Sequence, residues 1–156
     1  SAEFIKYRAA YGTEQSTVAA DYKNVVPLTG LIGAAGLPDG LDLVLTVQNY
    51  HDLHLKAFPA DTAAAANKQI FKALKPGGLY VVVDHAAAPG APLSVADTQH
   101  RIDEATVKTE VEAAGFKLEA EDRMLANPAD PHDKLVFDPS IRGKTDQFIL
   151  KFRKPK

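Results

Sequence analysis

The stretch Leu41-Asp-Leu-Val-Leu-Thr-Val-Gln-Asn-Tyr-His-Asp-Leu53 combines an apolar strand with an abrupt polar and titratable end. A second stretch, Leu74-Lys-Pro-Gly-Gly-Leu-Tyr-Val-Val-Val-Asp-His85, again stops at an acid and a histidine. A strand that is apolar on both faces is typical of a parallel sheet covered by helices. In such sheets ligands bind beyond the carboxyl ends of the strands. Two strands that end in polar groups at the same edge therefore predict a site.

Composition sets the broad class. The chain has 156 residues, of which 46% are hydrophobic, which is enough for one domain with a core. Its net charge of −2 provides no field for nucleic acid or an anionic membrane, and no apolar run is long enough to span a bilayer. The absence of cysteine excludes disulfides, thiolate metal sites and a cysteine nucleophile, but it leaves the compartment open.

The rest of the chain alternates helices and strands. Helices are expected at 2–11, 61–74 and 103–115, and strands at 25–29, 41–48, 79–83, 116–120 and 148–152. Asp61 or Thr62 caps the second helix, and Asp103 caps the third. The long connection 124–146 contains three prolines, and a loop of this length is usually a lid or a binding loop. The order predicts an α/β domain that ends in an antiparallel strand pair.

Four segments stand in an order that is familiar from one family. They are Leu41-Asp-Leu-Val-Leu with Tyr50-His-Asp, Leu74-Lys-Pro-Gly-Gly, Ala113-Ala-Gly-Phe116, and Gly143-Lys-Thr-Asp-Gln-Phe-Ile-Leu-Lys-Phe152. Over residues 24–156 this set resembles the carboxyl-terminal two thirds of a class I S-adenosylmethionine-dependent methyltransferase, of the bacterial predicted-methyltransferase kind. The resemblance implies a single Rossmann-like α/β domain over 1–156. Its sheet is mostly parallel with an antiparallel C-terminal strand, and its cofactor is S-adenosylmethionine.

The chain departs from this family at its start. The family's cofactor loop is a glycine-rich turn after the first strand, where backbone must approach the ligand closely. Nothing of that kind precedes residue 24, so we expect an N-terminally truncated version of the fold. The missing strands would lie between 25–29 and 41–48, which leaves 41–48 as an open edge. Three outcomes are open: 25–29 pairs there, a second copy pairs there as a homodimer or strand-swapped assembly, or the missing piece lies outside this chain.

The resemblance also assigns residues to roles. It places His51, Asp52 and His85 in catalysis near the methyl acceptor. It places Thr29, Gly30, Thr46 and Val47 on the cofactor side. Tyr50, Asp84, His100 and Arg142 are expected on the substrate side because of their places at the strand ends, before the third helix and in the long loop. A histidine near its ordinary pKa suits removal of a proton from an acceptor hydroxyl or amine.

Each assignment has a structural alternative. His51 is equally well explained as a loop residue that caps the following segment, and Asp84 as a turn residue that bonds its own backbone. For His100-Arg101 a surface ion pair is the favoured interpretation, and Arg142 fits a proline-pinned surface loop. His51, His54 and His85 with Asp52 contain the residue types of a metal site, but their spacing is common by chance, so no metal is expected.

The leading hypothesis is S-adenosylmethionine-dependent methyl transfer to a small-molecule acceptor, without nucleic acid or membrane partners. The alternative is a non-catalytic ligand-binding or assembly fragment of the same fold, which the missing glycine loop favours. Metal-dependent hydrolysis would rest on the histidines alone. The chain begins with Ser1 rather than methionine, so we expect that an initiator, a tag or a longer segment has been removed. The compartment is unknown, with the bacterial cytoplasm and, if that segment was a signal peptide, the periplasm as the two candidates.

Overall fold

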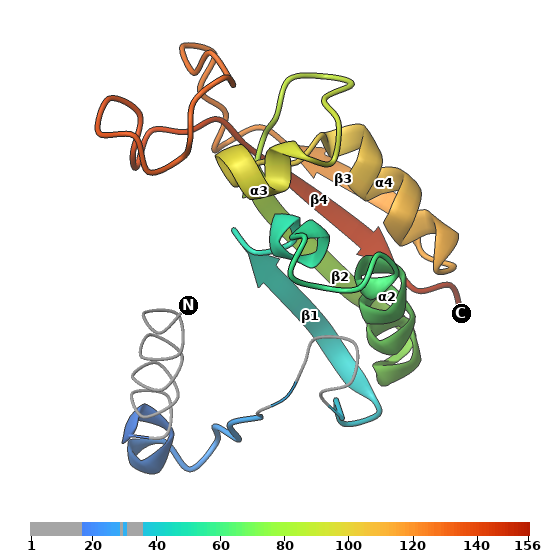
Figure 1. Cartoon of the computed structure of the whole chain (residues 1–156). Helices are drawn as coiled ribbons and strands as arrows, with labels where there is room; N and C mark the ends of the chain where they lie inside the picture. Colours follow the sequence, from blue (N-terminus) through green and yellow to red (C-terminus); the bar gives the residue numbers. More distant parts are fainter. Residues whose placement is uncertain (1–16, 29, 31–35) are drawn as a thin grey trace. The chain divides into compact units, whose positions relative to one another are not determined.

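A computed structural model describes residues 17–28, 30 and 36–156 (Figure 1). The chain divides into two compact units, Ser1–Leu31 and Ile32–Lys156, and the single domain over 1–156 stays a prediction. In the first unit residues 17–21 are helical. Residues 25–28 belong to no strand, so the strand expected at 25–29 is not formed over its described part. The helix expected at 2–11 lies outside the described residues.

The second unit is built on a four-stranded sheet in the order β1-β2-β4-β3. Its strands are β1 (Leu41–Val47), β2 (Leu74–His85), β3 (Lys117–Asp122) and β4 (Gln147–Arg153). β1 pairs with β2 in parallel, whereas β4 pairs antiparallel with both β2 and β3. Three strands therefore run in one direction and the last runs against them. This confirms the expected α/β sheet, mostly parallel with an antiparallel C-terminal strand.

Four helical segments accompany the sheet: η1 (His51–His54), α2 (Thr62–Ala73), α3 (Val95–Gln99) and α4 (Glu104–Ala113). The carboxylate of Asp103 caps α4 by accepting from the Ala105 N–H, as expected. Asp61 precedes α2 but makes no such side-chain bond. The hydroxyl of Thr62 instead donates to the carbonyl oxygen of Pro59, so Asp61 stands at the expected N-cap position but without the expected side-chain bond.

The link between α2 and β2 is tighter than the sequence pattern indicates. β2 begins at Leu74 rather than at residue 79, so helix and strand follow each other directly. A Cβ on Gly78 would lie 2.9 Å from the carbonyl oxygen of Lys75 and 3.2 Å from that of Leu41. Only glycine therefore allows the β1 and β2 backbones to approach here.

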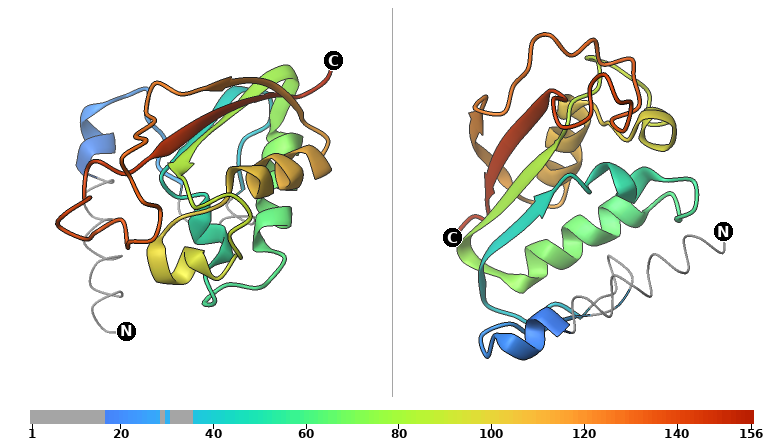
Figure 2. Two further views of the ribbon diagram at one scale, coloured as in Figure 1. Left: turned by 90° about the horizontal axis from the view of Figure 1, so that it is seen from above. Right: turned by 90° about the vertical axis from the view of Figure 1, so that its left-hand side faces the viewer.

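One face of the sheet carries the core. Figure 2 shows α2, α3 and α4 on the same side of the strands. The buried residues that meet there are Tyr80 and Val82 from β2, Phe148, Leu150 and Phe152 from β4, Ala66 and Ile70 from α2, and Val107 and Val111 from α4. In the strands these residues alternate, as a face that packs against helices requires. This single helix layer positions the strand ends that carry the polar residues.

The opposite face of β1 is open. Leu43, Leu45 and Val47 are each about half exposed. β1 is also an edge strand, because β2 is its only partner among the described residues. The expectation that this strand is buried on both faces was therefore wrong. The strand carries apolar residues on both faces, but the helices of the second unit cover only one of them.

Candidate functional site

The ends of β1 and β2 meet through one histidine and one carboxylate. The backbone N–H of His51 donates to Oδ2 of Asp84 at 2.7 Å, and its ring Nδ1 lies 2.8 Å from Oδ1. His51 opens η1 directly beyond β1, and Asp84 is the penultimate residue of β2. The polar ends of the two strands therefore gather at one edge of the sheet, as parallel pairing predicts.

Asp84 fixes which His51 nitrogen carries the proton. Its carboxylate is fully buried and also accepts from the backbone N–H of His85 at 2.7 Å. Because a carboxylate can only accept here, the Nδ1 of His51 carries the proton and Nε2 keeps its lone pair in the neutral ring. Asp84 thus has the geometry of a positioning residue rather than of a substrate contact.

The other ring nitrogen of His51 faces two further polar side chains. Its Nε2 lies 3.4 Å from Oδ1 of Asp52 and 3.2 Å from Nδ1 of His100. The Nδ1 of His100 lies 3.9 Å from the same Asp52 oxygen. We call His51, Asp52, His100 and the supporting Asp84 the histidine cluster. Asp52 and His100 are partly exposed, so the cluster opens to solvent on that side.

Burial and charge shift the pKa values of the cluster in different directions. Burial alone would lower the pKa of His51, but the hydrogen bond and charge of Asp84, with a contribution from Asp52, raise it overall. Burial raises the pKa of Asp52 despite the opposing effect of His51. Burial, followed by the charge of His51, lowers the pKa of His100. His51 is therefore the strongest proton acceptor among the cluster's rings.

His85 lies next to the cluster but has a partner of its own. The centres of the His51 and His85 rings are 6.1 Å apart. The Nδ1 of His85 lies 2.7 Å from the hydroxyl of Thr145 in the loop before β4. Burial lowers the pKa of His85 to about 4, so the ring is neutral at pH 7. Its catalytic role stays a prediction.

Tyr50 and His54 point into the helix layer instead. The hydroxyl of buried Tyr50 donates to Glu110 at 2.9 Å and accepts from Asn67 at 2.8 Å. The Nε2 of His54 lies 3.0 Å from the same Glu110 oxygen. The Tyr50 hydroxyl is therefore held by two side chains of the helix layer, and the substrate role predicted for Tyr50 stays a prediction. The metal set of His51, His54, His85 and Asp52 is not assembled either.

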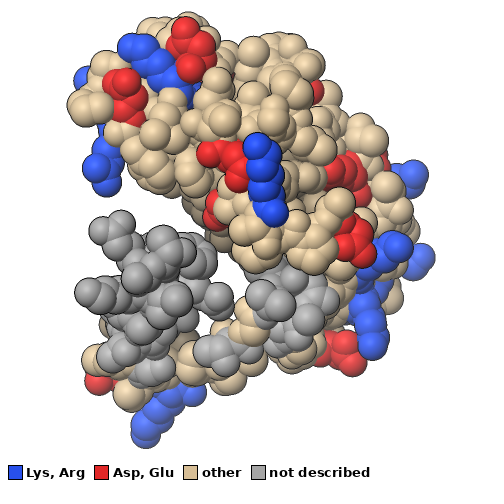
Figure 3. All heavy atoms as spheres, viewed as in Figure 1, with Lys and Arg blue, Asp and Glu red and all other residues tan. Residues whose placement is uncertain are grey.

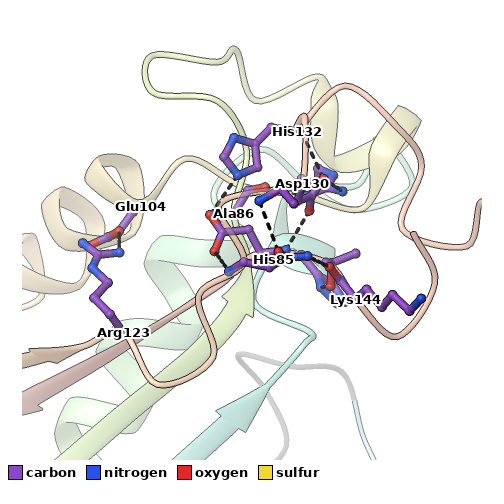
Figure 4. Close-up of polar contacts among 12 residues, drawn as sticks. His85, Ala86, Glu104, Arg123, Asp130, His132 and Lys144 are labelled. Carbon is purple, nitrogen blue, oxygen red and sulfur yellow. Dashed lines mark hydrogen bonds and ion pairs between the residues drawn. The ribbon is translucent and has the colours of Figure 1, made fainter. Parts of the chain in front are cut away.

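The long loop 124–146 is pinned by a buried ion pair. The Arg101 guanidinium donates to both carboxylate oxygens of Asp130, at 2.8 and 3.0 Å, and also to the Ala86 carbonyl oxygen. Figure 4 shows Asp130 beside Ala86, just beyond β2. Arg101 is fully buried, so the surface ion pair expected at His100-Arg101 was wrong. Nothing in the sequence marks Asp130, 29 residues away in the chain, as its partner.

The same loop brings an aromatic ring to the histidine cluster. The ring of Phe137 lies 5.2 Å from that of His100, centre to centre. The guanidinium of exposed Arg142 lies 5.9 Å from the centre of the same ring. Arg142 therefore contacts Phe137, which in turn contacts His100. Its substrate role, like that of His100, stays a prediction.

The residues expected on the cofactor side do not come together in one place as the histidine cluster does. Thr29 lies outside the described residues, and Gly30 belongs to the first unit. The Thr46 hydroxyl is buried on the helix-covered face of β1, whereas Val47 is on the open face. Side chains of neighbouring strand residues point to opposite faces, so Thr46 and Val47 cannot line one pocket with their side chains.

A cleft lies beside the histidine cluster without including it. Its volume is about 330 Å³, and it runs between η1 with its following loop and the start of α3. Leu53, His54, Phe58, Leu93 and Asp97 are among its lining residues. The cleft and the cluster share η1 but not a side chain. The sequence patterns described above did not predict this cleft.

Comparisons with known proteins address the fold. No protein-family model matches the chain, and no curated protein matches it. Among solved structures, the [4+2]-cyclase SpnF has a TM-score of 0.62 at 16% identity, over 90% of this chain and 60% of its own. A methyltransferase from Aquifex aeolicus, dependent on S-adenosylmethionine, has a TM-score of 0.55 at 15% identity, over 90% and 60%. The N-methyltransferase NodS from Bradyrhizobium japonicum has 0.54 at 17%, over 80% and 57%.

The fold is that of class I S-adenosylmethionine-dependent methyltransferases. The chain spans about 60% of the length of these structures. Because SpnF is named a cyclase, the shared fold leaves the reaction open. The reaction has to be argued from the residues at the strand ends.

Proposed function

We propose that this chain belongs to an enzyme that transfers a methyl group from S-adenosylmethionine to a small-molecule acceptor, with His51 as the general base. The observation that carries the proposal is the Asp84–His51 pair at the carboxyl edge of β1 and β2. Methyl transfer is a displacement, and a hydroxyl or amine acceptor must lose a proton as it reacts. An imidazole whose Nδ1 is held by a buried carboxylate has its lone pair on Nε2, which here faces His100 and Asp52 and is suited to take that proton.

The described residues do not form a cradle for the cofactor. When bound, S-adenosylmethionine supplies the methyl group on its sulfonium, and close backbone approach is what binds such a ligand in this fold. Among residues 17–28, 30 and 36–40 no strand precedes a glycine-rich turn. The cofactor side is therefore proposed on the resemblance alone, for Thr29, Gly30, Thr46 and Val47. The proton-accepting role of His51, in contrast, is argued from its contacts.

A small acceptor suits the surroundings of the histidine cluster. On the face shown in Figure 3 acidic and basic side chains are interspersed, and no basic patch stands out. Nucleic-acid sites need such a patch. The adjoining cleft of about 330 Å³ has the size of a small-molecule site and an apolar lining with few polar groups.

One observation favours a second function, an assembly fragment. The open face of β1 exposes Leu43, Leu45 and Val47, and its outer edge has no strand partner among the described residues. Exposed apolar edge strands tend to pair with another chain. In this alternative the fold serves association, through a homodimer or a strand exchange at β1, and the histidine cluster is structural.

Calorimetric titration with S-adenosylmethionine, and with its demethylated product, separates the two functions. Light scattering of the same sample gives the mass. The proposed enzyme is expected to bind with micromolar affinity and to move a labelled methyl group onto members of a panel of small phenols and amines. No heat from either ligand, together with a stable dimer, would contradict it and support assembly.

A matched pair of variants tests the role of His51. We expect His51→Gln to retain cofactor binding and to lower methyl transfer about 10²–10⁴-fold, the usual contribution of a general base. His132→Gln is the control, because His132 pairs with Asp146 outside the histidine cluster. Equal transfer rates in both variants, with unchanged circular dichroism, would remove His51 from the mechanism.

A further inference from the structure

We propose that the histidine cluster binds a divalent transition-metal ion through Nε2 of His51, Nδ1 of His100 and a carboxylate oxygen of Asp52. This goes beyond the proposed function, because ion binding requires neither the cofactor nor an acceptor. It also differs from the metal set weighed from the sequence, since His100 takes the place of His54 and His85. No cysteine contributes, so the ligand set consists of two imidazoles and one carboxylate.

The distances among the three ligand atoms suit a small ion. They are 3.2 Å from His51 Nε2 to His100 Nδ1, 3.4 Å from His51 Nε2 to Asp52 Oδ1, and 3.9 Å from His100 Nδ1 to Asp52 Oδ1. A tetrahedral zinc ion with bonds of about 2.0–2.1 Å has its ligand atoms roughly 3.3–3.4 Å apart. Only the longest edge needs to shorten. It involves the partly exposed Asp52 carboxylate, and rotation of that side chain shortens it while His100 stays in place.

The chemistry of the ligand set selects the class of ion. Two imidazole nitrogens and a carboxylate oxygen suit zinc, iron, cobalt and nickel better than magnesium or calcium, which prefer oxygen ligands. Three protein ligands leave a coordination position for water or a substrate atom, as in catalytic rather than structural zinc sites. The partial exposure of Asp52 and His100 provides that open side.

Asp84 supplies the supporting contact that such sites have. Histidine ligands of metals nearly always donate their other ring N–H to a carboxylate or carbonyl, which fixes the ring and its tautomer. Asp84 accepts from Nδ1 of His51 at 2.8 Å and is itself held by two backbone N–H groups, those of His51 and His85. The Nε2 lone pair of His51 is therefore aimed at the cluster before any ion arrives.

His100 is held in place by unusual backbone and by a ring contact. It ends α3 in the left-handed conformation, with φ 54° and ψ 49°, which costs energy in a residue other than glycine. Phe137 packs against its ring on the side of the loop 124–146. These contacts keep Nδ1 directed at Nε2 of His51, although no regular helix or strand positions the side chain.

A bound ion would change the part that His51 plays. It would use the lone pair that the proposed function assigns to proton removal, and the ion would lower the pKa of a hydroxyl that binds to it. The two proposals are nevertheless tested apart. Metal binding is measured without cofactor or acceptor, and methyl transfer is measured with and without metal.

The test is uptake of Zn²⁺ by the chelator-treated chain of 156 residues, followed by calorimetry and by elemental analysis after dialysis. Binding of one ion per chain is expected. Asp52→Asn and His100→Asn are expected to weaken affinity at least about tenfold, and Asp84→Asn about 10–100-fold through loss of the supporting contact. Asparagine at position 100 tolerates the left-handed backbone, so the fold should survive that change.

A matched control and a spectrum complete the design. His132→Asn removes a histidine that lies outside the cluster and is expected to leave affinity unchanged. Co²⁺ in place of Zn²⁺ is expected to give the visible absorption of a tetrahedral site, and His100→Asn is expected to lose it. The proposal is overturned if the native chain retains no ion, or if His132→Asn weakens binding as much as His100→Asn does.

Discussion

The two faces of the four-stranded sheet differ in what covers them. On one face Leu150 of β4 is fully buried, whereas on the other Leu45 of β1 has 56% of its surface exposed. Both are leucines in strands, so residue type does not account for the difference. The helices α2, α3 and α4 lie on one side only (Figure 2). Whether a strand residue is buried thus depends on the elements packed against it. Substitutions at covered and at open positions measure how much this packing contributes to stability.

The contrast between buried and exposed positions also applies to ion pairs, and here we expect the largest effect on the free energy of unfolding. Asp130→Asn leaves the buried Arg101 guanidinium without its anionic partner. We expect a loss of about 3–5 kcal/mol in the free energy of unfolding at pH 7, measured by urea denaturation. Arg123→Ala, which removes the surface pair with Glu104, should cost no more than about 1 kcal/mol. Equal losses would mean that burial does not distinguish the two pairs.

The difference in the free energy of unfolding between the native chain and Asp130→Asn should depend on pH. Burial alone would raise the pKa of Asp130, but Arg101 and two backbone N–H donors lower it overall, below the ordinary value of 3.8. A carboxyl with a lowered folded-state pKa adds stability above its unfolded pKa and loses it as the pH falls through the folded pKa. The free energies of unfolding of the two proteins should therefore converge as the pH falls below about 3.8. Parallel curves down to pH 2 would contradict this assignment.

Much of the second unit was predictable because its signals are local. Asp103 caps α4 as expected, and alternating apolar residues mark β3 and β4. The open face of β1 was not predictable, because an apolar strand has the same sequence whether or not a helix layer covers it. The early start of β2 was not predictable either, because it depends on the close approach of the β1 backbone that Gly78 permits.

The candidate site was predictable in part for the same reason. Parallel strands bring their carboxyl ends together, so His51 and Asp84 were expected at one edge. The direction of each side chain depends on the turn at η1, which sends Tyr50 to Glu110 and His51 to Asp84. His100 joins His51 only through the fold between β2 and α4, and no spacing in the sequence announces that contact.

Leu150→Ala tests the covered face directly. The side chain is fully buried in the core between the strands and the helix layer, so its truncation leaves a cavity. We expect a loss of about 2–5 kcal/mol in the free energy of unfolding, measured in urea. Leu93→Ala is the matched control, because this loop leucine is exposed. A loss below about 1 kcal/mol at position 150 would show that the helix layer packs loosely.

Tyr50→Phe tests the polar network beneath the helices with a smaller change. It removes the hydroxyl that accepts from Asn67 and donates to Glu110, and leaves the buried Asn67 amide without this acceptor. We expect a loss of about 1–3 kcal/mol in the free energy of unfolding, with Zn²⁺ affinity unchanged. Tyr22→Phe, at an exposed position, should have no effect. A loss of Zn²⁺ affinity in Tyr50→Phe would show that the hydrogen bonds of Tyr50 and the histidine cluster are coupled through η1.

Leu45→Ala tests the open face and should have the smallest effect. The side chain is more than half exposed, so the free energy of unfolding of the isolated chain should change by no more than about 0.5 kcal/mol. The measurement is repeated at two protein concentrations, because a second copy on this face would make stability depend on concentration. A loss near that of Leu150→Ala, present only at the higher concentration, would show that association covers β1. Equal and negligible losses at both concentrations would leave the open face as a true surface of the chain, and the contrast between the two faces would stand.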